Sequence, residues 1–95
     1  MKALRDPEGA ELRHINNTCD LSGKTVLEIG CGEGKLTYQY SGMAGRVIGI
    51  DPELSDLNVA KHQINSLDSF FIQAIGERLP FPSKVFDIVI FSSSL

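Results

Sequence analysis

The chain has 95 residues, of which 42% are hydrophobic and 22% charged, and its formal net charge is -3. This length permits one domain with a modest core, and the mild acidity gives no electrostatic footprint for nucleic acid or an anionic membrane. No apolar stretch approaches the roughly 20 residues of a membrane helix, and the first residues lack the apolar core of a secretion signal.

The two cysteines of the chain also limit its class. Cys19 and Cys31 are too few for a disulfide framework and do not have the spacing of metal ligands. We therefore expect a cytoplasmic protein with no metal site.

The first 21 residues are predicted to form an N-terminal helix and a connection, separate from a domain at residues 22–95. Asp6 can cap the helix and Pro7 suits its first turn. The helix would run to about Asn16, and polar residues and Gly23 then indicate a loop.

The rest of the chain alternates between strands and helices. Strands are predicted at Thr25–Ile29, Arg46–Ile50, Phe70–Ile75 and Val85–Phe91. One short helix covers Lys35–Ser41, with Leu36, Tyr40 and Met43 on one face, and a longer helix follows Pro52. Its buried side would carry Leu54, Leu57, Ala60, Ile64 and Leu67. This order predicts an α/β fold with a parallel sheet, and the last two strands are apolar enough to be covered on both faces.

Three glycines follow the first predicted strand in Val26–Thr37, which reads VLEIGCGEGKLT. Gly30, Gly32 and Gly34 would lie beyond the carboxyl end of that strand, where α/β proteins bind ligands. Glycine permits a tight turn and the close approach of a ligand to the backbone. A plain strand-to-helix turn explains the glycines equally well.

Asp51 favours a ligand at this turn. It ends the second strand, 21 residues after Gly30, where a carboxylate can accept hydrogen bonds from both ribose hydroxyls. Asp51 can also cap the helix that begins at Pro52, and the two roles are compatible. The paired signals favour a ligand that contains adenosine.

Glu28 distinguishes among such ligands. Its carboxylate is unfavourable beside a pyrophosphate, and Lys35 stands where a dinucleotide loop has its third glycine. A ligand ammonium is favourable instead, since two unit charges at 4 Å attract by roughly 4 kcal/mol at an effective dielectric of 20. The predicted ligand therefore combines ribose, adenine and an amino-acid ammonium.

These motifs resemble the N-terminal half of a class I S-adenosylmethionine-dependent methyltransferase of the methyltransferase domain 11 kind. The resemblance covers about residues 22–95. It rests on Val26–Gly34, Val47–Pro52, the helix with Ser55, Leu57 and Ala60, Gly76–Pro82, and Phe86–Val89. It implies a Rossmann-like parallel sheet with flanking helices, truncated to the strand order 3-2-1-4 of a seven-stranded fold.

The resemblance also implies roles for individual residues toward S-adenosyl-L-methionine. Gly30, Cys31 and Gly32, with Gly34 completing the turn, would present backbone to its methionine part, and Glu28 would help to anchor the amino group. Asp51 would bind the ribose hydroxyls, and Pro52 or its neighbour would pack on the adenine. Gly76 and Glu77 would flank the adenine from the other side. Ile75 stands where many relatives have an aspartate, which could weaken adenine binding by about 1–3 kcal/mol.

The resemblance further implies that the fourth strand lies at the edge of the sheet. An apolar edge strand is a template for pairing, so we expect self-association through this strand, disorder near the C-terminus, or a cover for the edge. The function predicted is methyl transfer to an unidentified, small-molecule acceptor, and we expect the 95-residue chain alone to lack turnover. A non-catalytic binding module that reuses the fold is the alternative, and a nicotinamide dehydrogenase fragment is disfavoured by Glu28 and the glycine spacing.

No residue is predicted to be a catalyst. Asp87 begins a buried strand and is expected to be structural, and His14 and His62 are expected at the surface. Cys31 is not expected to be a nucleophile. The space available in the turn is enough to explain a small side chain there, without a chemical role. Ser92, Ser93 and Ser94 could make a peripheral contact at the site.

Overall fold

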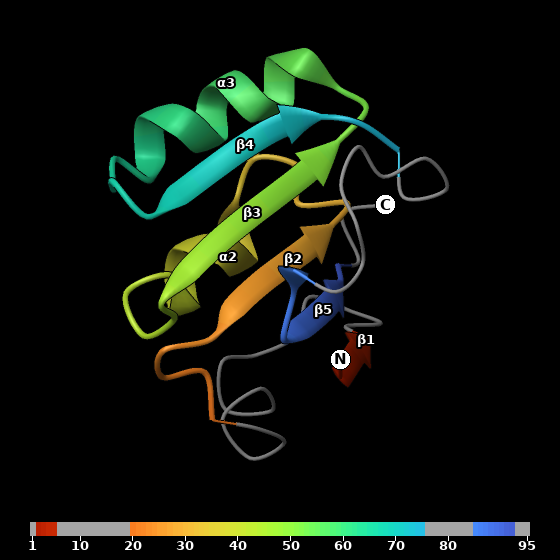
Figure 1. Ribbon diagram of the computed structural model, residues 1–95. Helices are drawn as coiled ribbons and strands as arrows, with labels where there is room; N and C mark the ends of the chain where they lie inside the picture. Colours follow the sequence, from red (N-terminus) through yellow and green to blue (C-terminus); the bar gives the residue numbers. More distant parts are fainter. Residues whose placement is uncertain (1, 6–19, 76–84, 93–95) are drawn as a thin grey trace.

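Five strands form one parallel sheet (Figure 1) in the computed structural model, which describes residues 2–5 (backbone only), 20–75 and 85–92. The strands are β1 (Lys2–Arg5), β2 (Thr25–Ile29), β3 (Arg46–Asp51), β4 (Ser69–Gln73) and β5 (Ile88–Phe91). Their spatial order is β1-β5-β2-β3-β4. The four strands predicted from the sequence therefore lie in the expected 3-2-1-4 order, and the Rossmann-like α/β class is confirmed.

Strand β1 was not predicted, and it changes the position of β5. β1 pairs in parallel with β5, with Lys2 opposite Ile88 and Arg5 opposite Phe91. The prediction that the fourth strand lies at the sheet edge is therefore wrong, because β5 is flanked by β1 and β2. Self-association through an exposed β5 loses its basis. The helix predicted from Asp6 to Asn16 lies outside the described residues.

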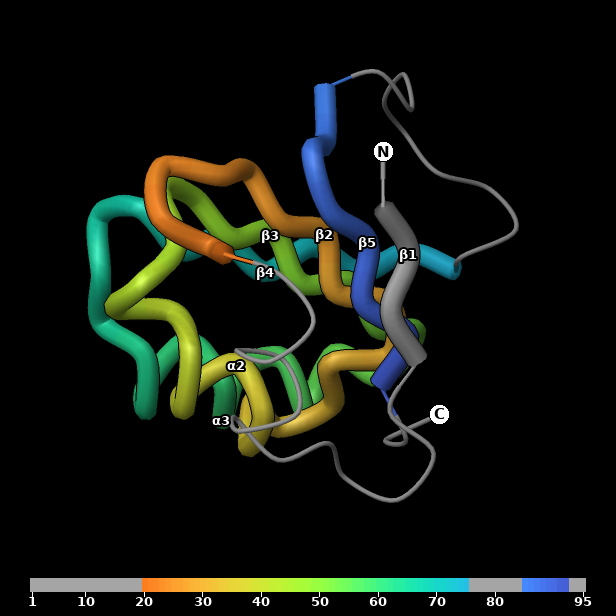
Figure 2. The backbone as a smooth tube through the Cα atoms, turned by 90° about the horizontal axis from the view of Figure 1, so that it is seen from below, coloured from red at the N-terminus to blue at the C-terminus, as the bar shows by residue number. Residues whose placement is uncertain are grey.

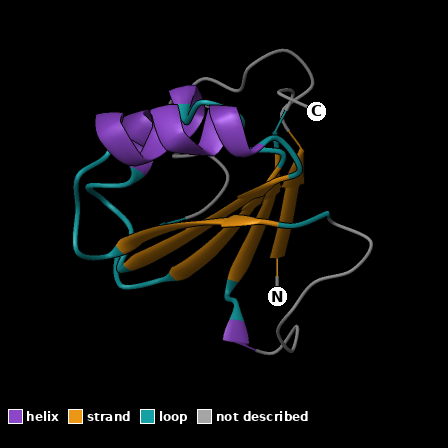
Figure 3. Ribbon diagram, turned by 90° about the horizontal axis from the view of Figure 1, so that it is seen from above, coloured by secondary structure: helices purple, strands orange, loops and turns teal. Residues whose placement is uncertain are grey.

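Two helices cover one face of this sheet, as Figures 2 and 3 show: α2 (Lys35–Tyr40) and α3 (Leu54–Gln63). The core under α2 joins that helix to three strands through Leu21, Val26, Leu36, Tyr40, Val47, Ile88 and Ile90. The core under α3 consists of Cys31, Leu57, Ala60, Ile64 and Phe71. Both helices therefore pack on the same face of the sheet, with α2 over β5, β2 and β3 and α3 over β3 and β4.

Three apolar residues predicted on packed helix faces are exposed, because two of them lie beyond the end of a helix and the third is at the first residue of one. Met43 is 40% exposed and follows the end of α2 at Tyr40. Leu67 is 94% exposed in the turn after α3, where helical periodicity no longer applies. Leu54, which begins α3, is 50% exposed.

The second face of the sheet carries two apolar rows that cross several strands. By register, one row is Phe70, Ile48, Leu27 and Val89, and the other is Ile72, Ile50, Ile29 and Phe91. The central residues of these rows are buried together with Phe86. At the β4 end, Phe70 and Ile72 are 46% and 37% exposed. The expectation that this strand is covered on both faces is wrong, since β4 is an edge strand.

The exposed apolar edge of β4 should promote aggregation, because its five residues include no charge to oppose pairing with another chain. Phe70→Lys should therefore lower concentration-dependent light scattering on heating. Leu54→Lys is the control, since it places the same charge at a comparably exposed position on α3. Equal scattering by Phe70→Lys and the unaltered chain would contradict the prediction.

Candidate functional site

The glycine turn between β2 and α2 is fixed to the carboxyl end of β3. Gly30, Gly32 and Gly34 have φ angles of 79°, 55° and 84°, which favour glycine. The amides of Gly30 and Cys31 both donate to the carbonyl oxygen of Ile50, at 2.9 and 3.1 Å. The turn therefore lies against the next strand of the sheet, with its backbone at the edge where parallel strands bind ligands.

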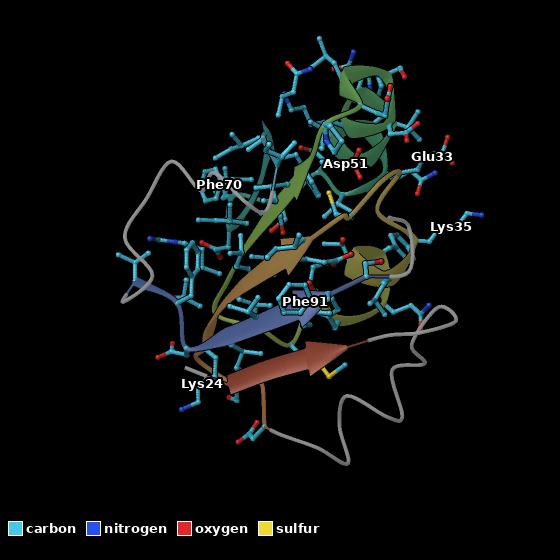
Figure 4. The ribbon with its side chains drawn as sticks, turned by 90° about the vertical axis from the view of Figure 1, so that its right-hand side faces the viewer. Lys24, Glu33, Lys35, Asp51, Phe70 and Phe91 are labelled. Carbon is cyan, nitrogen blue, oxygen red and sulfur yellow. The ribbon has the colours of Figure 1, made fainter. Side chains whose placement is uncertain are left out.

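Asp51 joins this turn to the start of α3. Its carboxylate is 4% exposed and lies at the end of β3, at the same end of the sheet as Glu33 and Lys35 and opposite to Lys24 (Figure 4). Oδ2 accepts a hydrogen bond from the Gly32 amide at 2.9 Å, and Oδ1 accepts one from the Glu53 amide at 2.9 Å. The predicted capping of a helix at Pro52 is wrong, because α3 begins at Leu54 with Glu53 as its N-cap, and Asp51 instead holds the amide of that N-cap residue. Each carboxylate oxygen keeps lone-pair capacity for another donor.

Glu28 is fully buried between β2 and α2. Its Oε1 accepts hydrogen bonds from Thr37 Oγ1 and from the Tyr40 hydroxyl, each at 2.7 Å. Burial raises the pKa of Tyr40 well above its usual value, and the Glu28 carboxylate adds to the rise. The carboxylate therefore ties β2 to α2, two residues before the glycine turn begins, and its contact with a ligand stays a prediction.

Cys31 is buried in the turn, with Sγ 3.8 Å from the Gly32 carbonyl oxygen. Burial raises the pKa of its thiol, and the Glu28 and Asp51 carboxylates raise it further. The reactive thiolate is therefore disfavoured, in agreement with the expectation that Cys31 is not a nucleophile. Its sulfur also explains the neighbouring glycine, since a Cβ on Gly49 would approach Sγ to 2.9 Å.

The other predicted site residues differ in position. Gly34 is buried, and a Cβ there would lie 3.1 Å from the Ala60 Cβ, so this glycine also lets α2 approach α3. Pro52 is exposed beside Asp51. Gly76 and Glu77 lie outside the described residues.

Two residues that were predicted to have no catalytic role are Asp87 and His62. Asp87 is at the amino end of β5, where its Oδ2 accepts the Thr25 amide at 2.9 Å and its own amide donates to the Thr25 carbonyl at 2.9 Å. This reciprocal pair supports a structural role. His62 is exposed on α3.

Sequence reasoning missed Thr37 and Tyr40 as partners of the buried carboxylate. Tyr40 was placed on the buried helix face, but only as packing. The available signal was two hydroxyl side chains three residues apart on a helix that follows a strand with a buried acid.

Neither a metal cluster nor a membrane span is found in the part of the chain that the structure describes. No three His, Cys, Asp or Glu residues in 20–75 and 85–92 are grouped as metal ligands, and no described helix is long and apolar enough to cross a bilayer. A groove of about 490 Å³ lies along β4 and the end of α3, and none of the predicted site residues lines it.

Comparison with known proteins gives the family. Residues 26–95 match the family model described as "Methyltransferase domain". The chain is 40% identical over 68 residues to a ubiquinone biosynthesis O-methyltransferase of Paraburkholderia phytofirmans, covering 72% of the chain and 28% of that protein. It is 38% identical over 80 residues to the ubiquinone/menaquinone biosynthesis C-methyltransferase UbiE of Vibrio vulnificus, covering 77% and 31%. The chain therefore belongs to the methyltransferase-domain family, and it spans less than a third of these relatives.

A solved structure supports the fold independently. The chain superposes on a SAM-dependent methyltransferase from Aquifex aeolicus with a TM-score of 0.74 at 24% identity, covering 83% of this chain and 45% of that one. At this identity the likeness concerns the fold alone. The resemblance inferred from the sequence motifs is confirmed by the family match.

Gly34→Ala should destabilise the chain by about 2–4 kcal/mol, because alanine is strained at positive φ and its methyl group would crowd Ala60. The measurement is the free energy of unfolding in urea. Gly42→Ala is the matched control, since a Cβ at Gly42 meets no atom within 4 Å. Equal losses in the two variants would contradict this account.

Cys31 should resist thiol reagents in the folded chain, because its thiol is buried and its pKa is raised. In a Cys19→Ser background, a disulfide reagent at pH 8 should react only after denaturation. Rapid labelling of the folded chain would refute the prediction.

The same raised pKa values predict how stability depends on pH. Since the folded state holds the protons of Cys31 and Tyr40 more tightly, the free energy of unfolding should fall as pH rises above about 8.5, the usual pKa of cysteine.

Proposed function

We propose that this chain is the cofactor-binding portion of an S-adenosylmethionine-dependent methyltransferase. The observation that carries the proposal is the junction of the glycine turn with the Asp51 carboxylate at the carboxyl ends of β2 and β3. At this junction the backbone of the glycine turn and the Asp51 carboxylate are joined by a hydrogen bond. Membership of the methyltransferase-domain family supports the same cofactor.

The described residues fit the chemistry of this cofactor. Asp51 offers acceptor oxygens to ribose hydroxyls at the rim of the sheet, and exposed Pro52 offers an apolar surface for adenine. Gly30, Cys31 and Gly32 supply the backbone facing the methionine part. Glu28 supplies negative charge under that turn and anchors the amino group, either by contact or through its field. We assign Gly76 and Glu77 to the other side of the adenine on the motif alone.

When bound, S-adenosylmethionine supplies an electrophilic methyl group. The contribution of this chain is to hold and orient it, because displacement at a methyl carbon depends mainly on alignment with the acceptor. No catalytic residue is assigned. The matched relatives are named as O- and C-methyltransferases of quinone biosynthesis, so we propose a small-molecule acceptor. We further propose that turnover requires more than these 95 residues.

Asp51→Asn should weaken S-adenosylmethionine binding about tenfold or more, because one carboxylate oxygen becomes an amide donor facing hydroxyls. Isothermal titration measures the effect. Asp87→Asn is the matched control, since it makes the same chemical change at the amino end of the sheet.

The same titration tests the alternatives. Nicotinamide dinucleotide should not compete with the methyl donor. The proposal fails if Asp51→Asn binds the donor as tightly as the unaltered chain, or if the dinucleotide displaces the donor.

A further inference from the structure

The fully buried carboxylate of Glu28 has a chemical setting that packing alone does not require. Two hydroxyl groups from α2, Thr37 Oγ1 and the Tyr40 hydroxyl, donate to the same oxygen at 2.7 Å. Hydroxyl donors stabilise the ionised form of a carboxylate and offset part of its desolvation. The network therefore favours a fixed negative charge two residues before Gly30.

That charge acts on the glycine turn. The Cys31 thiol lies in the turn, and its pKa is raised by the Glu28 and Asp51 carboxylates in addition to burial. Cys31 is itself buried and Gly32 is buried beside it, so the field of Glu28 crosses a region with little water. Fields are screened far less there than at an exposed surface.

The interaction of a ligand held on this turn with the Glu28 carboxylate depends on the charges that the ligand carries. The methyl donor has a sulfonium, an ammonium and a carboxylate. The demethylated product has the same ammonium and carboxylate but an uncharged thioether. A fixed negative charge under the turn therefore stabilises the donor more than the product.

We propose that Glu28 is the residue by which the site prefers the sulfonium donor over its thioether product, and that Thr37 and Tyr40 are positioning residues that hold its carboxylate in place. This inference rests on the proposed function of the turn. It gives the buried network a role in specificity, because the difference between the two affinities decides how strongly the product competes with the donor for the site.

The test is the ratio of two dissociation constants, product over donor, measured by isothermal titration with S-adenosylhomocysteine and S-adenosylmethionine. Glu28→Gln keeps an oxygen that can accept the two hydroxyl bonds but removes the charge. The ratio should fall about fivefold in this variant, mainly through weaker donor binding. Asp87→Asn removes a carboxylate at the far end of the sheet and should leave the ratio unchanged.

The positioning role is tested by a matched pair at residue 37. Thr37→Val removes the hydroxyl at nearly constant volume and should lower the ratio about twofold to threefold, as should Tyr40→Phe. Thr37→Ser keeps the hydroxyl and should restore the ratio of the unaltered chain. These variants also decide the question if Glu28→Gln fails to give the circular dichroism spectrum of the folded chain.

The outcomes separate this inference from the proposed function. If Glu28→Gln weakens both ligands by the same factor, or if Thr37→Val matches Thr37→Ser, the selectivity role is overturned while cofactor binding stands. If the unaltered chain binds neither ligand, the proposed function is contradicted, and this inference falls with it.

Discussion

The hydrogen bonds of the Asp51 carboxylate are the constraint on which the site depends. One oxygen fixes the glycine turn through the Gly32 amide, and the other fixes the start of α3 through the Glu53 amide. Because the turn is also bound to the Ile50 carbonyl, the β2–α2 connection cannot move independently of the end of β3. Charge-assisted bonds of this kind are worth about 1.5–3 kcal/mol each, so a single residue both shapes the turn and offers an acceptor to a ligand.

Glu28 performs the equivalent task on the other side of the turn. Asp51 links the turn to the following strand and helix, whereas Glu28 links it to α2 through Thr37 and Tyr40. The two acids differ in position, since Asp51 is the last residue of its strand and Glu28 lies inside one, although both are buried. This difference suits Asp51 to direct hydrogen bonding and Glu28 to a field effect. Burial raises the pKa of the Cys31 thiol in this turn, and the two carboxylates raise it further.

The sequence predicted most of the fold because local patterns determine it. Thr25–Ile29 is a strand with the predicted bounds, and Leu57 and Ala60 are buried on α3 as their spacing indicates. The failures concern properties that depend on partners distant in the chain. Lys2–Arg5 is too short and too charged to be identified as a strand, and only its pairing with β5 reveals it. Leu67 fits the helical period but follows the end of the helix. The partners of Glu28 were missed because a helix face predicts burial and not the acceptor that a hydroxyl will find.

The position of β5 explains why the site lies where it does. From β2 the chain adds β3 and then β4 on one side, and it later returns to place β5 on the other side of β2. The strand order therefore reverses at β2, and α/β sheets bind ligands beside such a switch point, beyond the carboxyl ends of the strands. The Ser92 amide, directly after β5, donates to the Ile29 carbonyl at 2.9 Å, which brings the end of β5 against the beginning of the glycine turn. Because β1 pairs with the far side of β5, β5 is an interior strand, and Ser92 lies beside the start of the turn and not at the border of the sheet. Ser92 therefore borders the glycine turn on the β5 side, and the Asp51 carboxylate borders it on the β3 side.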